Sequence, residues 1–267
     1  MDRRPILLVR DSYPEPPALD TAVSRATLEL VSQRKHPETL RVHRPAPIVA
    51  FGPRDLVEPG APAAVAAARA RGFAAVERLA GGRAAVFHPG TVAFSWAIPD
   101  PSPREGIRAR FDVLAGIAAE ALRSMGVDAR IGEVPGEYCP GEHSVNARGE
   151  RKILGVGQRV VAGAAHVGGV VVVSGAARVR DVLIPVYEAL EIPWDPTTVG
   201  SVEDEVPGTG WDEVEAALLE AFAARFDLEE GGLPEPVLRR ARELLPRHAL
   251  EGPLGKAGGA RTGLPAG

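Results

Sequence analysis

The chain has 267 residues, which is long enough for one domain with a full hydrophobic core. Its net charge is −4 with both signs interspersed, which argues against nucleic acid and an acidic membrane as partners. A single cysteine excludes an intrachain disulfide and a cysteine-based metal site, so we expect no metal and a reducing, cytoplasmic compartment. The first ten residues contain too short an apolar run for a signal peptide or a membrane span.

The first half of the chain alternates helix and strand signals. A helix is predicted from Asp20 to about Arg34, because Asp20 is a suitable N-cap and apolar residues recur behind it. Strands are predicted at 39–43, 48–52, 84–88 and 91–98, and an alanine-rich helix at 63–71.

The second half continues this pattern. Helices are predicted at 104–125, 179–190, 211–226 and 236–245, a strand at 168–174, and a hairpin around 148–150. We therefore expect an α/β (α+β) fold with a mixed, mostly antiparallel sheet and packing helices. We divide the chain into a main domain at 1–205, a short helical extension at 206–250 and a disordered tail at 251–267.

The cysteine and a lysine define the most informative stretch. Cys139 stands before a Pro-Gly turn, and Lys152, one of three lysines among 31 basic residues, opens the strand that returns from the hairpin. The hairpin would bring the sulfur and the ammonium into one pocket, and a nearby cation lowers a thiol pKa. The alternative is that Cys139 is a small buried apolar residue and Lys152 a surface charge.

A second informative stretch is a double glycine between two arginines. Gly81 and Gly82 lie between Arg78 and Arg83, in a connection between strands. Paired glycines let the backbone approach a ligand and expose N–H groups to its oxygens, and the arginines favour an anionic or carbonyl-bearing ligand. A double glycine by itself also marks many ordinary turns.

These stretches resemble motifs of the biotin/lipoate protein ligase superfamily, in its lipoate–protein ligase A and octanoyltransferase branches. Residues 152–158, KILGVGQ, are similar to its Lys-x-x-Gly-x-(Ala/Ser) strand, with glycine in place of alanine or serine. The double glycine is similar to its arginine-glycine loop, although Ala93 stands where asparagine is common. Residues 138–141, YCPG, resemble the thiol motif of the branch that moves octanoyl groups between lipoyl domains. The resemblance covers about residues 20–205.

The resemblance implies a class II synthetase or biotinyl/lipoyl ligase-like catalytic domain. Its expected function is an acyltransferase that places an octanoyl or lipoyl group on a lysine of a lipoyl-carrier protein through a Cys139 thioester. Lys152 would hold the acyl carbonyl oxygen, and His143 or His166 would pass protons. The residues implied are catalytic Cys139 and Lys152, and substrate-binding Arg78, Gly81, Gly82, Arg83, His88, Gly155 and Gly157.

The implied partners are lipoyl-domain proteins, namely the glycine cleavage H protein or a 2-oxoacid dehydrogenase E2, and acyl carrier protein, with no permanently bound cofactor. One alternative is an ATP-dependent lipoate–protein ligase that works through lipoyl-adenylate with ATP and Mg²⁺, with Cys139 a bystander. Two further alternatives are a catalytically silent carrier-binding homologue and an unrelated α/β domain. Biotin ligation is disfavoured because the Gly-Arg-Gly-Arg-x-Gly loop of that branch is absent.

Overall fold

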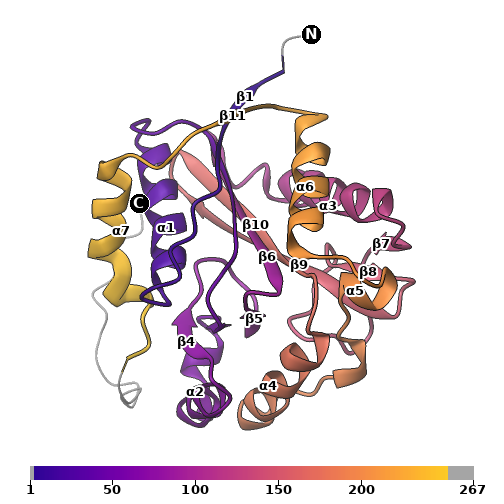
Figure 1. The fold of residues 1–267 in the computed structure, drawn as a ribbon. Helices are drawn as coiled ribbons and strands as arrows, with labels where there is room; N and C mark the ends of the chain where they lie inside the picture. Colours follow the sequence, from indigo (N-terminus) through magenta and orange to yellow (C-terminus); the bar gives the residue numbers. More distant parts are fainter. Residues whose placement is uncertain (1–2, 252–267) are drawn as a thin grey trace.

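A computed structural model describes residues 3–251, and within them eight strands form one mixed sheet (Figure 1). The strand order across this sheet is β11-β1-β2-β6-β10-β9-β8-β7. β1 pairs in parallel with both β2 and β11, and the remaining neighbours are antiparallel. The strands are β1 (Pro5–Val9), β2 (Thr39–His43), β6 (Thr91–Pro99), β7 (Ala129–Ile131), β8 (Val145–Ala147), β9 (Arg151–Val161), β10 (Ala164–Val172) and β11 (Asp227–Glu230).

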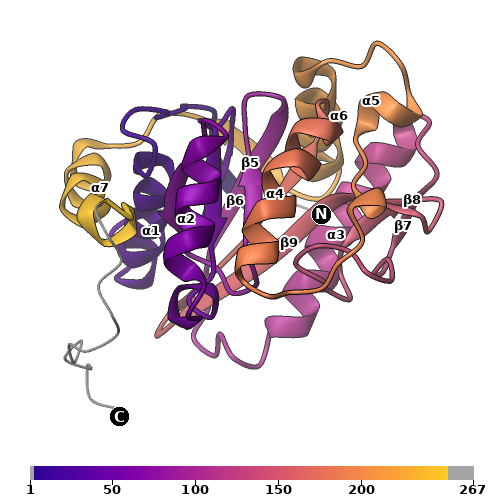
Figure 2. The ribbon, with the colours of Figure 1, turned by 90° about the horizontal axis from the view of Figure 1, so that it is seen from below.

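A second, smaller sheet has the order β4-β3-β5, with β4 (Ala74–Glu77), β3 (Ile48–Phe51) and β5 (Ala85–Phe87). Two helices, α2 (Ala61–Ala70) and α4 (Ala176–Ala189), lie side by side and share a core with this sheet (Figure 2). The short helical turns are η1 (Asp55–Val57), η2 (Pro196–Thr198) and α5 (Val202–Glu205).

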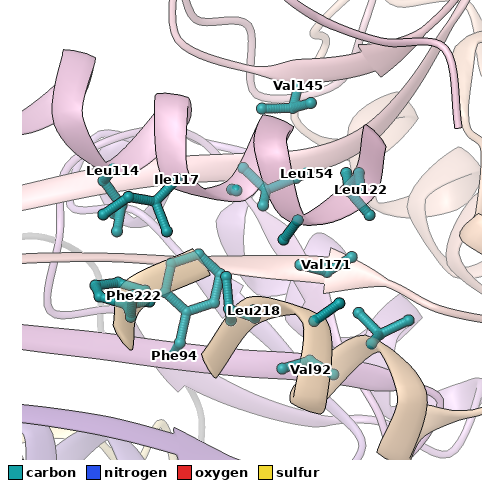
Figure 3. Packing of buried hydrophobic residues seen from close by; sticks show 14 of the residues in the cluster. Val92, Phe94, Leu114, Ile117, Leu122, Val145, Leu154, Val171, Leu218 and Phe222 are labelled. Carbon is teal, nitrogen blue, oxygen red and sulfur yellow. The ribbon is translucent and has the colours of Figure 1, made fainter. Parts of the chain in front are cut away.

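The main hydrophobic core lies on one face of the large sheet, under α3 (Ile107–Ser124) and α6 (Trp211–Ala223). Figure 3 shows side chains of both helices gathered around Phe94 and Val171 of the sheet. Phe222 of α6 packs edge-on against Trp96 of β6, with ring centroids 5.7 Å apart. The other face carries α1 (Leu19–Ser32), which packs on β6 and β10 and is covered by α7 (Glu235–His248).

The face under α1 has small residues at its centre. Neighbouring strands align His43, Ala93, Val170 and Gly155 in one row, and Arg41, Ser95, Gly168 and Gly157 in the next. Because side chains alternate along a strand and Phe94 points into the α3–α6 core, Ala93 and Ser95 face the opposite side. The small residues leave room above this part of the sheet.

The predicted fold class is confirmed: the sheet is mixed and mostly antiparallel, and helices pack on it. The predicted helices and strands occur within a few residues of their expected bounds, but β1, β4, β7 and β11 were not predicted. The segment 206–250 is not only helical, because β11 pairs with β1 between α6 and α7. The tail expected at 251–267 lies outside the described residues except for Glu251. Within residues 3–251 no helix is both long and apolar enough to cross a bilayer.

Phe222→Ala tests whether α6 is part of the main core. Phe222 is fully buried, so its truncation should lower the free energy of unfolding by about 3–5 kcal/mol. Val113→Ala on α3, where the residue is 41% exposed, should change it by less than about 0.5 kcal/mol. Urea denaturation measures both, and a loss under 1 kcal/mol for Phe222→Ala would contradict this packing.

Candidate active site

A cavity of about 110 Å³ lies between the small-residue face of the large sheet, the β4-β3-β5 sheet and α1. Cys139, in the loop between β7 and β8, lines it together with Lys152 and Gly155 of β9. Arg78, directly after β4, lines it from the smaller sheet. The hairpin predicted between β8 and β9 is confirmed, and it places the cysteine and the lysine at one cavity.

The Cys139 backbone is held in a strained conformation by a tyrosine. Its φ is +43°, in the left-handed region that a non-glycine residue rarely adopts. The Cys139 N–H donates to the Tyr187 hydroxyl at 2.9 Å, and that hydroxyl donates to the Ala84 carbonyl at 2.9 Å. Tyr187 of α4 therefore ties the cysteine loop to the start of β5.

The Cys139 sulfur faces two hydrogen-bond donors. The Arg83 backbone N–H lies 3.3 Å from Sγ, and Nη1 of Arg78 lies 3.5 Å from it. Burial alone would raise the pKa of the Cys139 thiol, but the charges of Arg78 and Lys152 and these hydrogen bonds outweigh it. The pKa is thus lowered below the usual thiol value, which increases the thiolate fraction at neutral pH.

Lys152 is only 1% exposed, and three oxygen atoms surround its ammonium. Nζ donates to the Glu137 carboxylate at 2.8 Å, to the Tyr138 carbonyl at 2.9 Å and to the Cys139 carbonyl at 2.7 Å. An ammonium has three N–H donors, so the cysteine loop occupies all of them. Although Lys152 lines the cavity, all three of its donors therefore bind the cysteine loop in this structure.

Glu137 is the centre of this loop, and its side chain is fully buried. Besides Lys152, its carboxylate accepts hydrogen bonds from the backbone N–H groups of Val134 and Gly141 and from the Ser144 hydroxyl. No sequence pattern singles out Glu137 or Tyr187. Glu137 stands in a turn, where a carboxylate is usually solvated, and Tyr187 lies 48 residues after the cysteine.

The glycine loop supports the sulfur. At Gly82, where φ is +111°, a Cβ would lie 2.9 Å from the Cys139 sulfur and 2.8 Å from Nη1 of Arg78. A Cβ at Gly157, where the family pattern has alanine or serine, would lie 3.0 Å from Cβ of Ala80 and 3.0 Å from Nη2 of Arg78, which is a tight approach. The Gly81 N–H donates to the Gln158 carbonyl at 3.4 Å, which holds the loop on β9.

The remaining predicted residues have different surroundings. The Arg83 guanidinium pairs with Asp55 and Glu58 and does not line the cavity. His88 also lies outside the cavity, and its Nδ1 accepts a hydrogen bond from the Gly90 N–H at 3.0 Å.

Of the two histidines considered for proton transfer, one lines the cavity. His143 pairs with Asp112 at 2.8 Å and stacks on Phe111, away from the cavity lining. His166 lines the cavity, and burial together with the Arg78 charge lowers its pKa to about 4. Its ring is therefore neutral at pH 7.

Arg78→Gln should raise the thiol pKa of Cys139, because Arg78 is the leading cation that lowers it. The pH dependence of alkylation by iodoacetamide measures this value, and its midpoint should move to higher pH than in the unsubstituted protein. Arg180→Gln, at a surface pair with Asp181, is the matched control and should leave the midpoint unchanged. An unshifted midpoint in Arg78→Gln would contradict the assigned role.

Breaking the buried ion pair between Glu137 and Lys152 tests how far the stability of the cysteine loop depends on it. Glu137→Gln leaves the Lys152 ammonium without its counter-ion and should lower the free energy of unfolding by about 3–5 kcal/mol. The double variant Glu137→Gln/Lys152→Met removes both charges and should recover much of that loss, as judged by urea denaturation. Equal stability of Glu137→Gln and the unsubstituted protein would show that the pair does not hold the loop.

Comparisons with known proteins match this architecture. A lipoyl-[GcvH]:protein N-lipoyltransferase from Listeria monocytogenes is 26% identical over 150 residues, which are 55% of this chain and 54% of that protein. The chain therefore matches about half the length of this relative.

Solved structures share the fold. The putative lipoate protein ligase Ta0514 from T. acidophilum, with bound lipoic acid, has a TM-score of 0.72 at 22% identity, covering 92% of this chain and 96% of that one. A lipoate-protein ligase A bound with ATP has a TM-score of 0.74 at 22% identity, covering 92% and 95%. The family model of the lipoyl protein ligase A/B catalytic domain matches residues 16–223, and the chain belongs to that family.

Proposed function

We propose that the protein is an acyltransferase that moves an octanoyl or lipoyl group onto a lysine of a lipoyl-domain protein through a thioester on Cys139. The observation that carries the proposal is the cysteine itself. Its sulfur lines the cavity, accepts two hydrogen bonds from Arg78 and Arg83, and has a lowered pKa. A thiol in such surroundings is suited to nucleophilic attack.

The proposed reaction has two transfers. The Cys139 thiolate attacks the carbonyl carbon of an acyl-lysine amide on a donor lipoyl domain. The new C–S bond forms, the C–N bond breaks, and the leaving amine takes up a proton. The amine of an acceptor lysine then attacks the thioester, loses a proton, and releases the thiolate. The neutral ring of His166 lines the same cavity and is our candidate to move these protons.

When the thiolate attacks, negative charge develops on the carbonyl oxygen, and hydrogen-bond donors close to the sulfur would stabilise it. Arg78 lines the cavity beside Sγ, whereas the Arg83 N–H donates to Sγ from a residue outside the cavity lining. We assign the stabilisation of the oxyanion to Arg78. Lys152 contributes its charge from the cavity wall but no free donor, because the Glu137, Tyr138 and Cys139 oxygens bind its three N–H groups.

The relatives support both the chemistry and the partners. The Listeria relative is named a lipoyltransferase that uses GcvH, and an archaeal ligase of this fold, from Thermoplasma acidophilum, was described together with its E2 lipoyl domain. Membership in a family of catalytic domains supports an enzyme. Ala93 lines the cavity where the resemblance leads us to expect asparagine, and this departure counts against the nucleotide-binding half of the pocket that the ATP-dependent ligase needs.

Incubation with an octanoylated H protein should produce an adduct of the octanoyl mass that hydroxylamine removes. Intact-mass spectrometry should detect it in the unsubstituted protein and not in Cys139→Ala. As a control, Ser102→Ala on an exposed turn should form the adduct as the unsubstituted protein does. An adduct that survives Cys139→Ala, or acyl-adenylate formation from ATP, Mg²⁺ and lipoate without any adduct, would contradict the proposal.

A further inference from the structure

The cavity continues well beyond the cysteine, toward a polar end. Gly155 of β9 and His43 of β2 occupy one row of the sheet and are separated by β10 and β6. Three strand spacings of about 4.8 Å place these two residues about 14 Å apart. Ala93 and Val170 lie between them, so an extended chain attached to Cys139 would run over apolar residues toward His43.

The far end is formed by buried polar groups. Asp20 and Ser24 of α1, His43 of β2 and Ser95 of β6 all line this cavity. Oδ1 of Asp20 is bound by Arg41 and by the Tyr13 N–H, and the Ser24 hydroxyl donates to Ser95 at 3.3 Å. Asp20 and His43 are 5% and 7% exposed, so bulk water reaches neither.

Two atoms at this end have no hydrogen-bond partner among residues 3–251. They are Oδ2 of Asp20 and Nδ1 of His43. Nε2 of His43 lies 3.9 Å from Oδ1 of Asp20, too far for a hydrogen bond. Burial and the Arg41 charge lower the His43 pKa to about 3, so this ring is neutral and offers one donor and one acceptor.

We propose that Asp20 and His43 form a specificity subsite for the distal end of the acyl chain, and that the subsite selects a lipoyl group over an octanoyl group. The inference rests on the proposed acyl transfer. The sulfurs of a closed lipoyl ring are weak acceptors for an imidazole N–H, and the thiols of the open form are weak donors to a carboxylate. An octanoyl group ends in a methyl group, which can form a hydrogen bond with neither Asp20 nor His43.

A site with buried polar atoms discriminates against a ligand that cannot bond to them. An octanoyl chain offers neither a donor nor an acceptor at this end and leaves Oδ2 of Asp20 and Nδ1 of His43 unpaired. One missing hydrogen bond of ordinary strength corresponds to a factor of about three to ten in a rate or a binding constant. The lipoyl group should therefore be favoured by about tenfold.

The test compares kcat/KM for one lipoyl-domain donor carrying either a lipoyl or an octanoyl group. The unsubstituted protein should prefer the lipoyl donor by about tenfold, and His43→Phe should lower that ratio by about three- to tenfold. His43→Gln, which keeps a donor and an acceptor, should retain more of the preference. His36→Phe is the matched control: His36 is also buried with an unpaired ring nitrogen but does not line this cavity, so the ratio should not change.

Equal or reversed preference in the unsubstituted protein would overturn the inference while leaving acyl transfer intact. So would an unchanged ratio in folded His43→Phe. Calorimetric binding of free lipoic and octanoic acid to Cys139→Ala tests the subsite without any transfer. Tighter binding of lipoic acid there supports the subsite even when no donor reacts, and equal binding overturns it.

Discussion

The buried ion pair between Glu137 and Lys152 is the constraint on which the proposed site depends. A carboxylate and an ammonium that are both removed from water are unfavourable unless each is fully hydrogen-bonded. Here the loop provides every partner: two backbone N–H groups and the Ser144 hydroxyl for the carboxylate, and two backbone carbonyls for the ammonium. The loop therefore folds around the pair, and Cys139 is fixed at its tip with a left-handed backbone.

In this site, one residue fixes the backbone of the cysteine loop and another contacts the sulfur. Lys152 fixes the backbone of the cysteine loop and adds a positive charge near the sulfur. Arg78 reaches the sulfur from the other sheet and lines the cavity, and its Nη1 also donates to the Arg83 carbonyl at 2.7 Å. Gly82 and Gly157 make that approach possible, because a Cβ at either position would lie within 3.0 Å of an Arg78 nitrogen. The position of Arg78 therefore depends on glycine at both positions.

Much of the fold follows from local patterns in the sequence. Apolar periodicity and turn residues located α3 and β6, and the Arg148-Gly149-Glu150 turn located the β8–β9 hairpin that joins Cys139 and Lys152 in one cavity. The strands that were missed are short or lie at the edges. β11 has the sequence DLEE and is mostly exposed, so only its pairing with β1 makes it a strand.

The partners of the site residues were harder to predict. Tyr187 reaches Cys139 from a distant helix, and His43 comes within 3.9 Å of Asp20 only because α1 packs on β6 and β10. No spacing in the sequence encodes such contacts. Glycine-loop residues were expected to contact the substrate, yet Gly81, Gly82 and Arg83 do not line the cavity, and Gly82 and the Arg83 N–H lie against the sulfur. A loop that positions a nucleophile and a loop that binds a ligand can both consist of glycines and arginines, so the sequence does not distinguish them.

The most direct measurement of the central claim is a single turnover from the isolated acyl-enzyme. The acylated protein is freed of donor and mixed with an unmodified lipoyl domain, without ATP, and the mass of both proteins is followed over time. The account predicts that the acyl mass leaves Cys139 and appears on the acceptor at the same rate. An acyl group that remains on the enzyme, or an acceptor that is modified only when ATP is added, would contradict it.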